Sequence, residues 1–118
     1  MQRKATRQSR AINAAERHHM QWGKERGICS ACGAHGGVIA HHFAGSSAKV
    51  RVGLQRVLIG HWAVNFLCQS CDDIVTHQSR RAFREIYGNE CDVWLKQAEQ
   101  YPVEIPLDVI QGIAQYGK

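Results

Sequence analysis

The sequence reads CSAC at residues 29–32, IAHH at residues 39–42 and CQSC at residues 68–71, and these three stretches decide the fold. Two residues between paired cysteines let both sulfur atoms of one turn reach the same ion, and two such pairs supply the four thiolates of a tetrahedral zinc site. We therefore expect a structural Zn²⁺ that ties two distant segments together, with the ligands Cys29, Cys32, Cys68 and Cys71.

Composition places the chain among small globular domains. With 118 residues, 44% of them hydrophobic, it has room for a modest core and is too apolar for wholesale disorder. No apolar run approaches the ~20 residues of a bilayer crossing, and no secretory signal is visible, so we expect a cytoplasmic protein without a membrane partner. In that reducing compartment, paired cysteines bind metal more often than they form disulfides. Cys91 is expected to be a small buried residue, and His35 is a weaker alternative zinc ligand.

Positive charge is concentrated at the N-terminus. Residues 1–26 hold seven Lys and Arg against two Glu, a surplus of five, whereas the rest of the chain holds eight basic and eight acidic residues. We interpret residues 1–10 as a basic flexible arm and residues 11–118 as a single zinc-stabilised domain. A basic arm is typical of proteins that contact phosphate backbones, although a solvated tail explains the charge equally well. The DNA-binding residues expected on this basis are Arg3, Lys4, Arg7 and Arg10, with Lys49 and Arg51 in a later loop.

Local signals predict the order of elements around the cysteines. Ser9 and Ser79 are each placed to cap a helix, and glycines follow where those helices should stop. In chain order we expect a helix over residues 10–25, a strand over 38–40, a loop over 43–56, an extended segment over 62–67, helical structure from residue 72, and helices over 80–87, 90–100 and 107–116. The chain is therefore predicted to be α+β, with two strands and a helix clasped by zinc and further helices around them.

Histidines and an aspartate beside the cysteine pairs suggest a second, catalytic metal. The predicted fold brings the end of the first strand, at His41 and His42, against the helix that carries Asp72 and His77. A divalent ion held there by imidazole and carboxylate can bind a phosphate oxygen, while a free imidazole takes a proton from the attacking water. Plainer roles stay open: packing or hydrogen bonding for the two strand histidines, and helix capping for Asp72.

The same residues resemble a known family. The chain is similar to the HNH, or ββα-metal, nucleases, and most closely to the phage Ref-type recombination-enhancement nucleases, which depend on RecA. The resemblance covers roughly residues 17–95 and is carried by GICSAC at 27–32, IAHH at 39–42, LCQSC at 67–71, His77, and RRAFREIYG at 80–88. It implies a DNA endonuclease with His42 as the general base, a RecA filament as a partner, and a catalytic metal on His41, Asp72 and His77.

Two positions depart from the family pattern. Where the family often has two histidines, this chain has Cys71 and Asp72. A thiolate binds zinc at least as well as imidazole does, whereas a carboxylate favours a harder catalytic ion such as Mg²⁺ or Mn²⁺. The middle asparagine of the HNH name is Ala63 here, and Asn65 lies two places away, on the same side of a strand.

Because of these departures, other interpretations of the function stay open besides the nuclease. One is a catalytically decayed zinc module that binds DNA or a host recombination protein as an adaptor. Another is an inhibitor or assembly factor that docks on a host protein through residues 90–118. The sequence pattern leaves open whether the DNA is single-stranded, duplex or branched, and it leaves the oligomeric state open.

Overall fold

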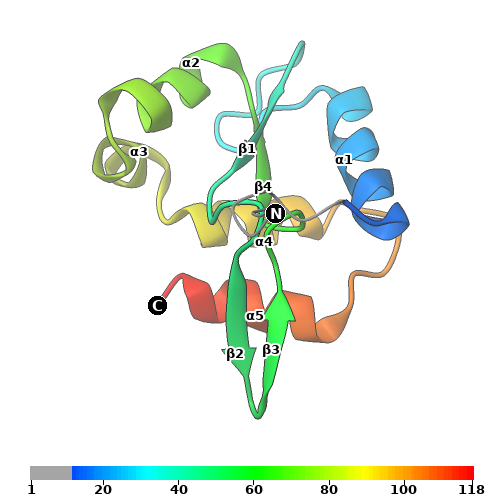
Figure 1. Ribbon diagram of the computed structural model, residues 1–118. Helices are drawn as coiled ribbons and strands as arrows, with labels where there is room; N and C mark the ends of the chain where they lie inside the picture. The colour runs from blue at the N-terminus through cyan, green and yellow to red at the C-terminus, as the bar shows by residue number, and fades with distance from the viewer. Residues whose placement is uncertain (1–11) are drawn as a thin grey trace, which may run out of the picture.

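Two short antiparallel ribbons form the frame of the molecule, and the strands of one lie between those of the other along the chain. The computed structural model describes residues 12–118. In it β1 (Ile39–His42) pairs with β4 (Val64–Leu67), and the chain between them folds back as a hairpin of β2 (Lys49–Val52) and β3 (Gln55–Leu58). Figure 1 shows this hairpin extending away from one end of the β1–β4 ribbon.

Within residues 12–118, five α-helices surround the two ribbons, which confirms the predicted α+β class. They are α1 (Ala14–Arg26), α2 (Gln69–Asp73), α3 (Arg80–Tyr87), α4 (Glu90–Ala98) and α5 (Leu107–Tyr116), and a π-helical segment (Ile74–Gln78) continues α2 towards α3. Helix α4 contacts β4, and α5 contacts the hairpin. In Figure 1, α2 and α3 lie across the β1–β4 ribbon from α1.

The first helix begins later than its sequence pattern predicts. The side chain of Asn13 accepts a hydrogen bond from the N–H of Glu16 (2.8 Å), and the Glu16 carboxylate accepts one from the N–H of Asn13 (2.9 Å). This reciprocal capping box fixes the start of α1 at Ala14 rather than near residue 10. Ser9 and the basic arm lie outside the described residues. Gly27 ends the helix as predicted, with a left-handed φ of 61°.

The prediction of a loop over residues 43–56 is wrong, because residues 49–52 form β2 and residues 55–58 form β3. Val50 pairs with Val57 across the hairpin, on the face that packs against α5. Gly112 of α5 allows this close approach, since a Cβ there would lie 3.0 Å from a methyl carbon of Ile59. The alternating KVRV segment carries a strand signal, but QRVL does not alternate, and the glycine and serines just before residue 49 are typical of a loop.

Two apolar clusters fill the interior. The larger lies among β3, α4 and α5, and its members Ile59, Trp94 and Ile113 are completely buried. The smaller lies beside the cysteine pairs and includes Phe83 of α3, which is also completely buried. Ile86, on the same helix, is 60% exposed, because α3 packs mainly against the π-helical segment and α4.

Side chains and a loop close the outer edge of β4. The Gln97 side chain, from α4, is buried; its Nε2 donates to the carbonyl of Val64 (3.0 Å), and its Oε1 accepts from the N–H of Phe66 (3.2 Å). The N–H of Ser30 donates to the carbonyl of Phe66 (2.8 Å). On α1, Gly23 lies so close to the Phe66 ring that a Cβ would fall 2.1 Å from it. Helices α1 and α4 and the first cysteine pair are therefore all fixed on β4.

Candidate functional site

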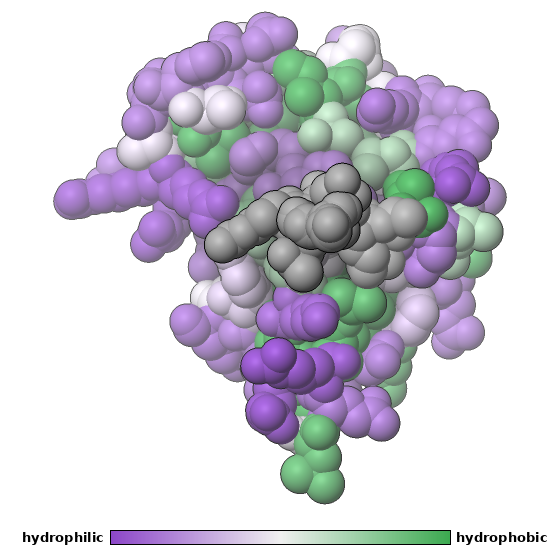
Figure 2. All heavy atoms as spheres, in the orientation of Figure 1, coloured by the Kyte–Doolittle hydropathy of each residue, from purple (hydrophilic) through white to green (hydrophobic). Residues whose placement is uncertain are grey.

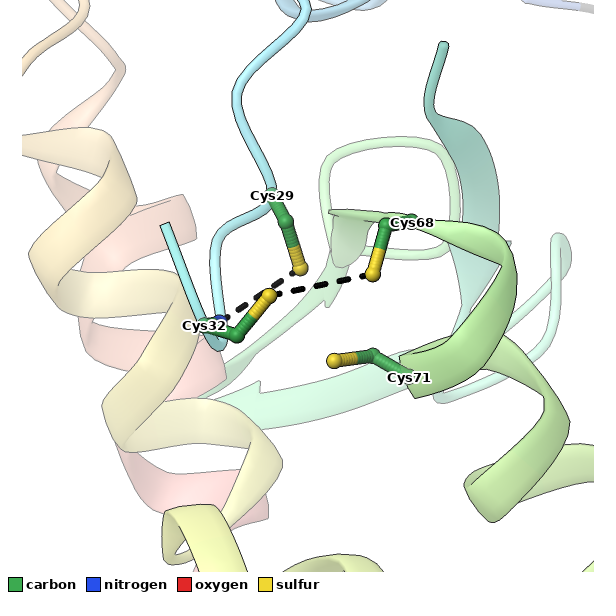
Figure 3. A group of neighbouring side chains, drawn as sticks. All are labelled: Cys29, Cys32, Cys68 and Cys71. Atoms are coloured by element: carbon green, nitrogen blue, oxygen red, sulfur yellow. Dashed lines mark hydrogen bonds between the residues drawn. The ribbon is translucent and has the colours of Figure 1, made fainter. Parts of the chain in front are cut away.

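The four paired cysteines lie together where the β1–β4 ribbon ends. One ligand atom from each lies within 4.8 Å of the other three, and the sulfurs of Cys32 and Cys68 are 3.7 Å apart. A tetrahedron with ~2.3 Å metal–sulfur bonds has edges of about 3.8 Å, so the observed spacing suits zinc. Figure 3 shows all four side chains pointing towards one centre, two from the turn after α1 and two from the start of α2. His35 is not part of this group, so the predicted ligand set is the one that could hold a metal ion.

Backbone N–H groups favour ionisation of one of the four thiols, that of Cys29. The N–H of Cys32 donates to the sulfur of Cys29 (3.5 Å), and Gly33, with a φ of 80°, lets the turn close. Burial opposes ionisation of Cys29, but the N–H groups of Cys32, Cys68 and Ala31 outweigh it and lower the Cys29 pKa to about 7. Burial in turn raises the pKa of Cys71. A cation at the centre would favour all four thiolates, because it offsets both burial and their mutual repulsion.

A second group of polar side chains lies around His41 on β1. Its Nε2 lies 3.2 Å from Oε2 of Glu90, and its Nδ1 lies 3.9 Å from Oδ1 of Asp72. All three side chains are more than four-fifths buried. Nε2 of His41 and Oε2 of Glu90 have no hydrogen-bond partner among residues 12–118. On the other side, Nε of Arg80 lies 3.8 Å from Oε1 of Glu90 and balances part of its charge.

Strand register and a helix cap bring Glu90 to His41. The two strands place His41 opposite Asn65, which is completely buried. Nδ2 of Asn65 donates to the carbonyl of Glu90 (3.1 Å), and the Asn89 side chain caps α4 by accepting from the N–H of Cys91 (2.8 Å). These contacts fix the first turn of α4, so the Glu90 carboxylate faces the histidine. Sequence reasoning missed Glu90, because no local spacing signals a contact that depends on strand register.

The second histidine of the pair, His42, meets a histidine that sequence reasoning also missed. Nε2 of His42 lies 3.3 Å from Nδ1 of His61. Burial, followed by the nearby charges of His61, His41 and Lys24, lowers the pKa of His42 below its ordinary value. His61 follows Gly60, where a Cβ would lie 2.1 Å from the carbonyl oxygen of Ser46, so only glycine lets the loop pass there. At neutral pH the His42 ring is therefore uncharged, which is the form that can accept a proton.

The remaining predicted site residues lie elsewhere. His77 is 76% exposed in its side chain and pairs with Asp73 (3.8 Å), its neighbour one helical turn earlier, rather than with Asp72. Within residues 12–118 the four cysteines are the only group of three or more His, Cys, Asp or Glu whose ligand atoms converge, so His41, Asp72 and His77 do not form a common site. Lys49 and Arg51 lie on the exposed face of β2. Arg3, Lys4, Arg7 and Arg10 lie outside the described residues.

Comparisons with protein-family models, with curated proteins and with solved structures found no match for this chain. None of the helices between residues 12 and 118 combines the length and the apolar character that a bilayer crossing requires.

Proposed function

We propose that this protein is a metal-dependent DNA endonuclease of the HNH, or ββα-metal, type, and that it is related in function to the Ref-type recombination nucleases. The observation that carries the proposal is the pair of histidines at the end of β1. The first ring lies between two carboxylates, and the second is half-buried, with a lowered pKa, beside another imidazole. Both stand on a ribbon anchored by the four-cysteine centre.

The residues around His41 fit a divalent ion, with Glu90 in the place that the sequence assigned to His77. Adjacent ligands at ~2.1 Å from an octahedral ion lie about 3.0 Å apart, close to the 3.2 Å between Nε2 of His41 and Oε2 of Glu90. These two atoms are buried without hydrogen-bond partners in the described chain, as expected for atoms that face a cation. Asp72, on the Nδ1 side, would orient the imidazole, as carboxylates commonly do behind a metal-binding histidine.

The proposed chemistry divides between the two histidines. An ion held by His41 and Glu90 would polarise the scissile phosphate and stabilise the leaving oxygen. Because a carboxylate is a hard ligand, this ion would be Mg²⁺ or Mn²⁺. His42 would take the proton from the attacking water, because its lowered pKa keeps the ring neutral. Arg80, held by its hydrogen bond to the carbonyl of Phe43 (2.8 Å), would add positive charge beside the phosphate.

One observation favours the adaptor as a second candidate. In the described part of the chain, only the four cysteines converge as three or more metal-ligand side chains, and His77 is turned towards solvent. A decayed module would need the cysteine-bound zinc alone. The two candidates therefore differ in the number of metal ions bound per chain.

Cleavage assays test the proposal. Plasmid and single-stranded DNA are incubated with Mg²⁺ or Mn²⁺, each with and without a RecA filament, and wild type is compared with His42→Ala. We expect cleavage that falls at least 100-fold in His42→Ala while zinc content and folding persist. His77→Ala is the matched control and should cleave like wild type, because that ring is exposed and pairs with Asp73 rather than with the residues around His41. If wild type cleaves nothing in any of these reactions, the adaptor replaces the nuclease.

A further inference from the structure

The β2–β3 hairpin has one apolar face and one basic face. Cross-strand pairing places Lys49 opposite Leu58 and Arg51 opposite Arg56, and all four side chains are exposed. The other face, with Val50 and Val57, packs on α5. The hairpin is therefore supported from behind and presents its positive charges outward on a fixed backbone.

The basic face lacks counter-charges. Two arginines directly opposite each other destabilise a strand pair unless a negative charge lies between them. No ion pair within residues 12–118 involves Lys49, Arg51 or Arg56. The sequence also contains no Asp or Glu between Glu25 and Asp72. The hairpin thus carries a local excess of positive charge that the described fold does not neutralise.

The tip of the hairpin is apolar. Gly53, with a φ of 63°, makes the turn, and Leu54 beside it is 96% exposed. Figure 2 shows an apolar group projecting at the end of the hairpin, next to strongly hydrophilic side chains. An exposed leucine on a tight turn, with Arg51 and Arg56 nearby in the chain, has the chemistry of the apolar wedges that minor-groove proteins press between base pairs.

The base of the hairpin adjoins the candidate catalytic histidine. β1 ends at His42, and six residues separate it from the start of β2 at Lys49; β3 is followed by the segment that carries His61. The N–H of Ile59 donates to the carbonyl of Ala48 (2.9 Å) and closes the base. The base of the hairpin therefore lies next to the end of β1.

We propose that the hairpin is a DNA-binding arm that enters the minor groove of duplex DNA, with Arg51 and Arg56 on the two phosphate backbones and Leu54 pressed between base pairs, so that the duplex bends. The inference rests on the proposed function only in the choice of DNA as the polyanion. It adds double-stranded DNA as the substrate form and a bent duplex as the bound state.

Binding and bending are measured without cleavage, in the His42→Ala background. A 30-base-pair duplex with a fluorophore at each end reports bending by energy transfer, and titrations at several salt concentrations give the dissociation constant. Netropsin, a minor-groove ligand, is added as a competitor. We expect Arg51→Gln with Arg56→Gln to lower the salt slope by about 1.8 and Leu54→Ser to abolish most of the bending with a smaller loss of affinity.

Matched control variants remove two positive charges and one exposed leucine at positions outside the hairpin. Arg81→Gln with Lys96→Gln removes two positive charges outside the hairpin, and Leu107→Ser removes a leucine that is 67% exposed on α5. Three results would each overturn the inference: equal effects of the hairpin and control variants, a duplex left unbent by the parent His42→Ala protein, or binding that netropsin does not affect. A protein that binds and bends DNA through the hairpin but never cleaves it would refute the nuclease and leave the arm standing. Cleavage by the protein with an intact His42, together with normal binding by the hairpin variants, would overturn the arm and leave the nuclease standing.

Discussion

A buried histidine gives a quantitative prediction about stability and pH. His19 on α1 is completely buried, and neither ring nitrogen has a hydrogen-bond partner among residues 12–118. Its ring is packed among aromatic rings, with centroids 5.4 Å from that of Trp62 and 4.8 Å from that of Tyr101. Burial, followed by the charge of the neighbouring His18, lowers the pKa of His19 from 6.5 to about 4.

The direction of the effect follows from proton uptake. Between pH 6.5 and about 4 the unfolded chain binds a proton at His19 that the folded chain does not, so stability falls as pH falls through this window. Each unit of pKa difference is worth about 1.4 kcal/mol. Between pH 7 and pH 5, where the folded ring is still neutral, the loss from this one group is about 2 kcal/mol, and it approaches 3 kcal/mol near pH 4.

The assay is urea unfolding at pH 7 and at pH 5, with zinc present, for wild type and His19→Leu. Leucine fills a similar volume without a titrating group, so the difference between the two proteins cancels the pH effects of the cysteines and the other histidines. Between pH 7 and pH 5, the free energy of unfolding of wild type should fall by about 2 kcal/mol more than that of the variant, which corresponds to a shift of roughly 1 M in the urea midpoint. Equal losses in the two proteins would show that the ring gains its proton inside the fold, and the reasoning would fail.

Three further predictions concern the metal sites and the α1 interface. Removing metal with a chelator should abolish most of the free energy of unfolding, which is ~5–15 kcal/mol for a typical domain, and thermal melting before and after zinc is restored measures this loss. The Cys71→Ser variant should behave like the chelated protein, and the Cys91→Ala variant should retain one zinc. Gly23→Ala should lower the free energy of unfolding in urea by about 1–3 kcal/mol, because the added Cβ would overlap the Phe66 ring. A variant stabilised by ~1 kcal/mol, as helix propensity alone predicts for alanine, would contradict this packing. Glu90→Gln should weaken Mn²⁺ binding at least 10-fold, measured by electron paramagnetic resonance with zinc content as the control, and unchanged Mn²⁺ binding would remove Glu90 from the proposed ligand set.

Sequence reasoning succeeded where the signal is local. The cysteine cluster follows from spacing alone, because both sulfurs of each turn must point at one centre. The Ser79 cap of α3 is confirmed for the same reason, since its hydroxyl accepts from the N–H of Ala82 three residues later. The expectation that Cys91 is buried is also confirmed, and its exposed fraction is 2%.

The contacts that sequence reasoning missed are long-range. Glu90 reaches His41 only because β4 carries Asn65 opposite that histidine and because Asn65 holds the backbone of α4. His77 was expected at the same site, but its position in the helix pairs it with Asp73 instead. The hairpin was missed for a different reason: each of its strands is four residues long, and short alternating segments give a weak signal beside glycines and serines.

The glutamine on the outer edge of β4 has a consequence for solubility. A two-stranded ribbon has two open edges, and each is a template on which a strand of another molecule can add. Gln97 occupies one acceptor and one donor of β4 as a neighbouring strand would, and the Ser30 N–H occupies the next acceptor. Replacing Gln97 by leucine would keep most of the side-chain volume but leave those backbone groups unpaired. Those groups would stay buried beneath α4 without partners, so the variant would lose stability, and an opening of α4 would expose an edge on which a strand of another molecule could add.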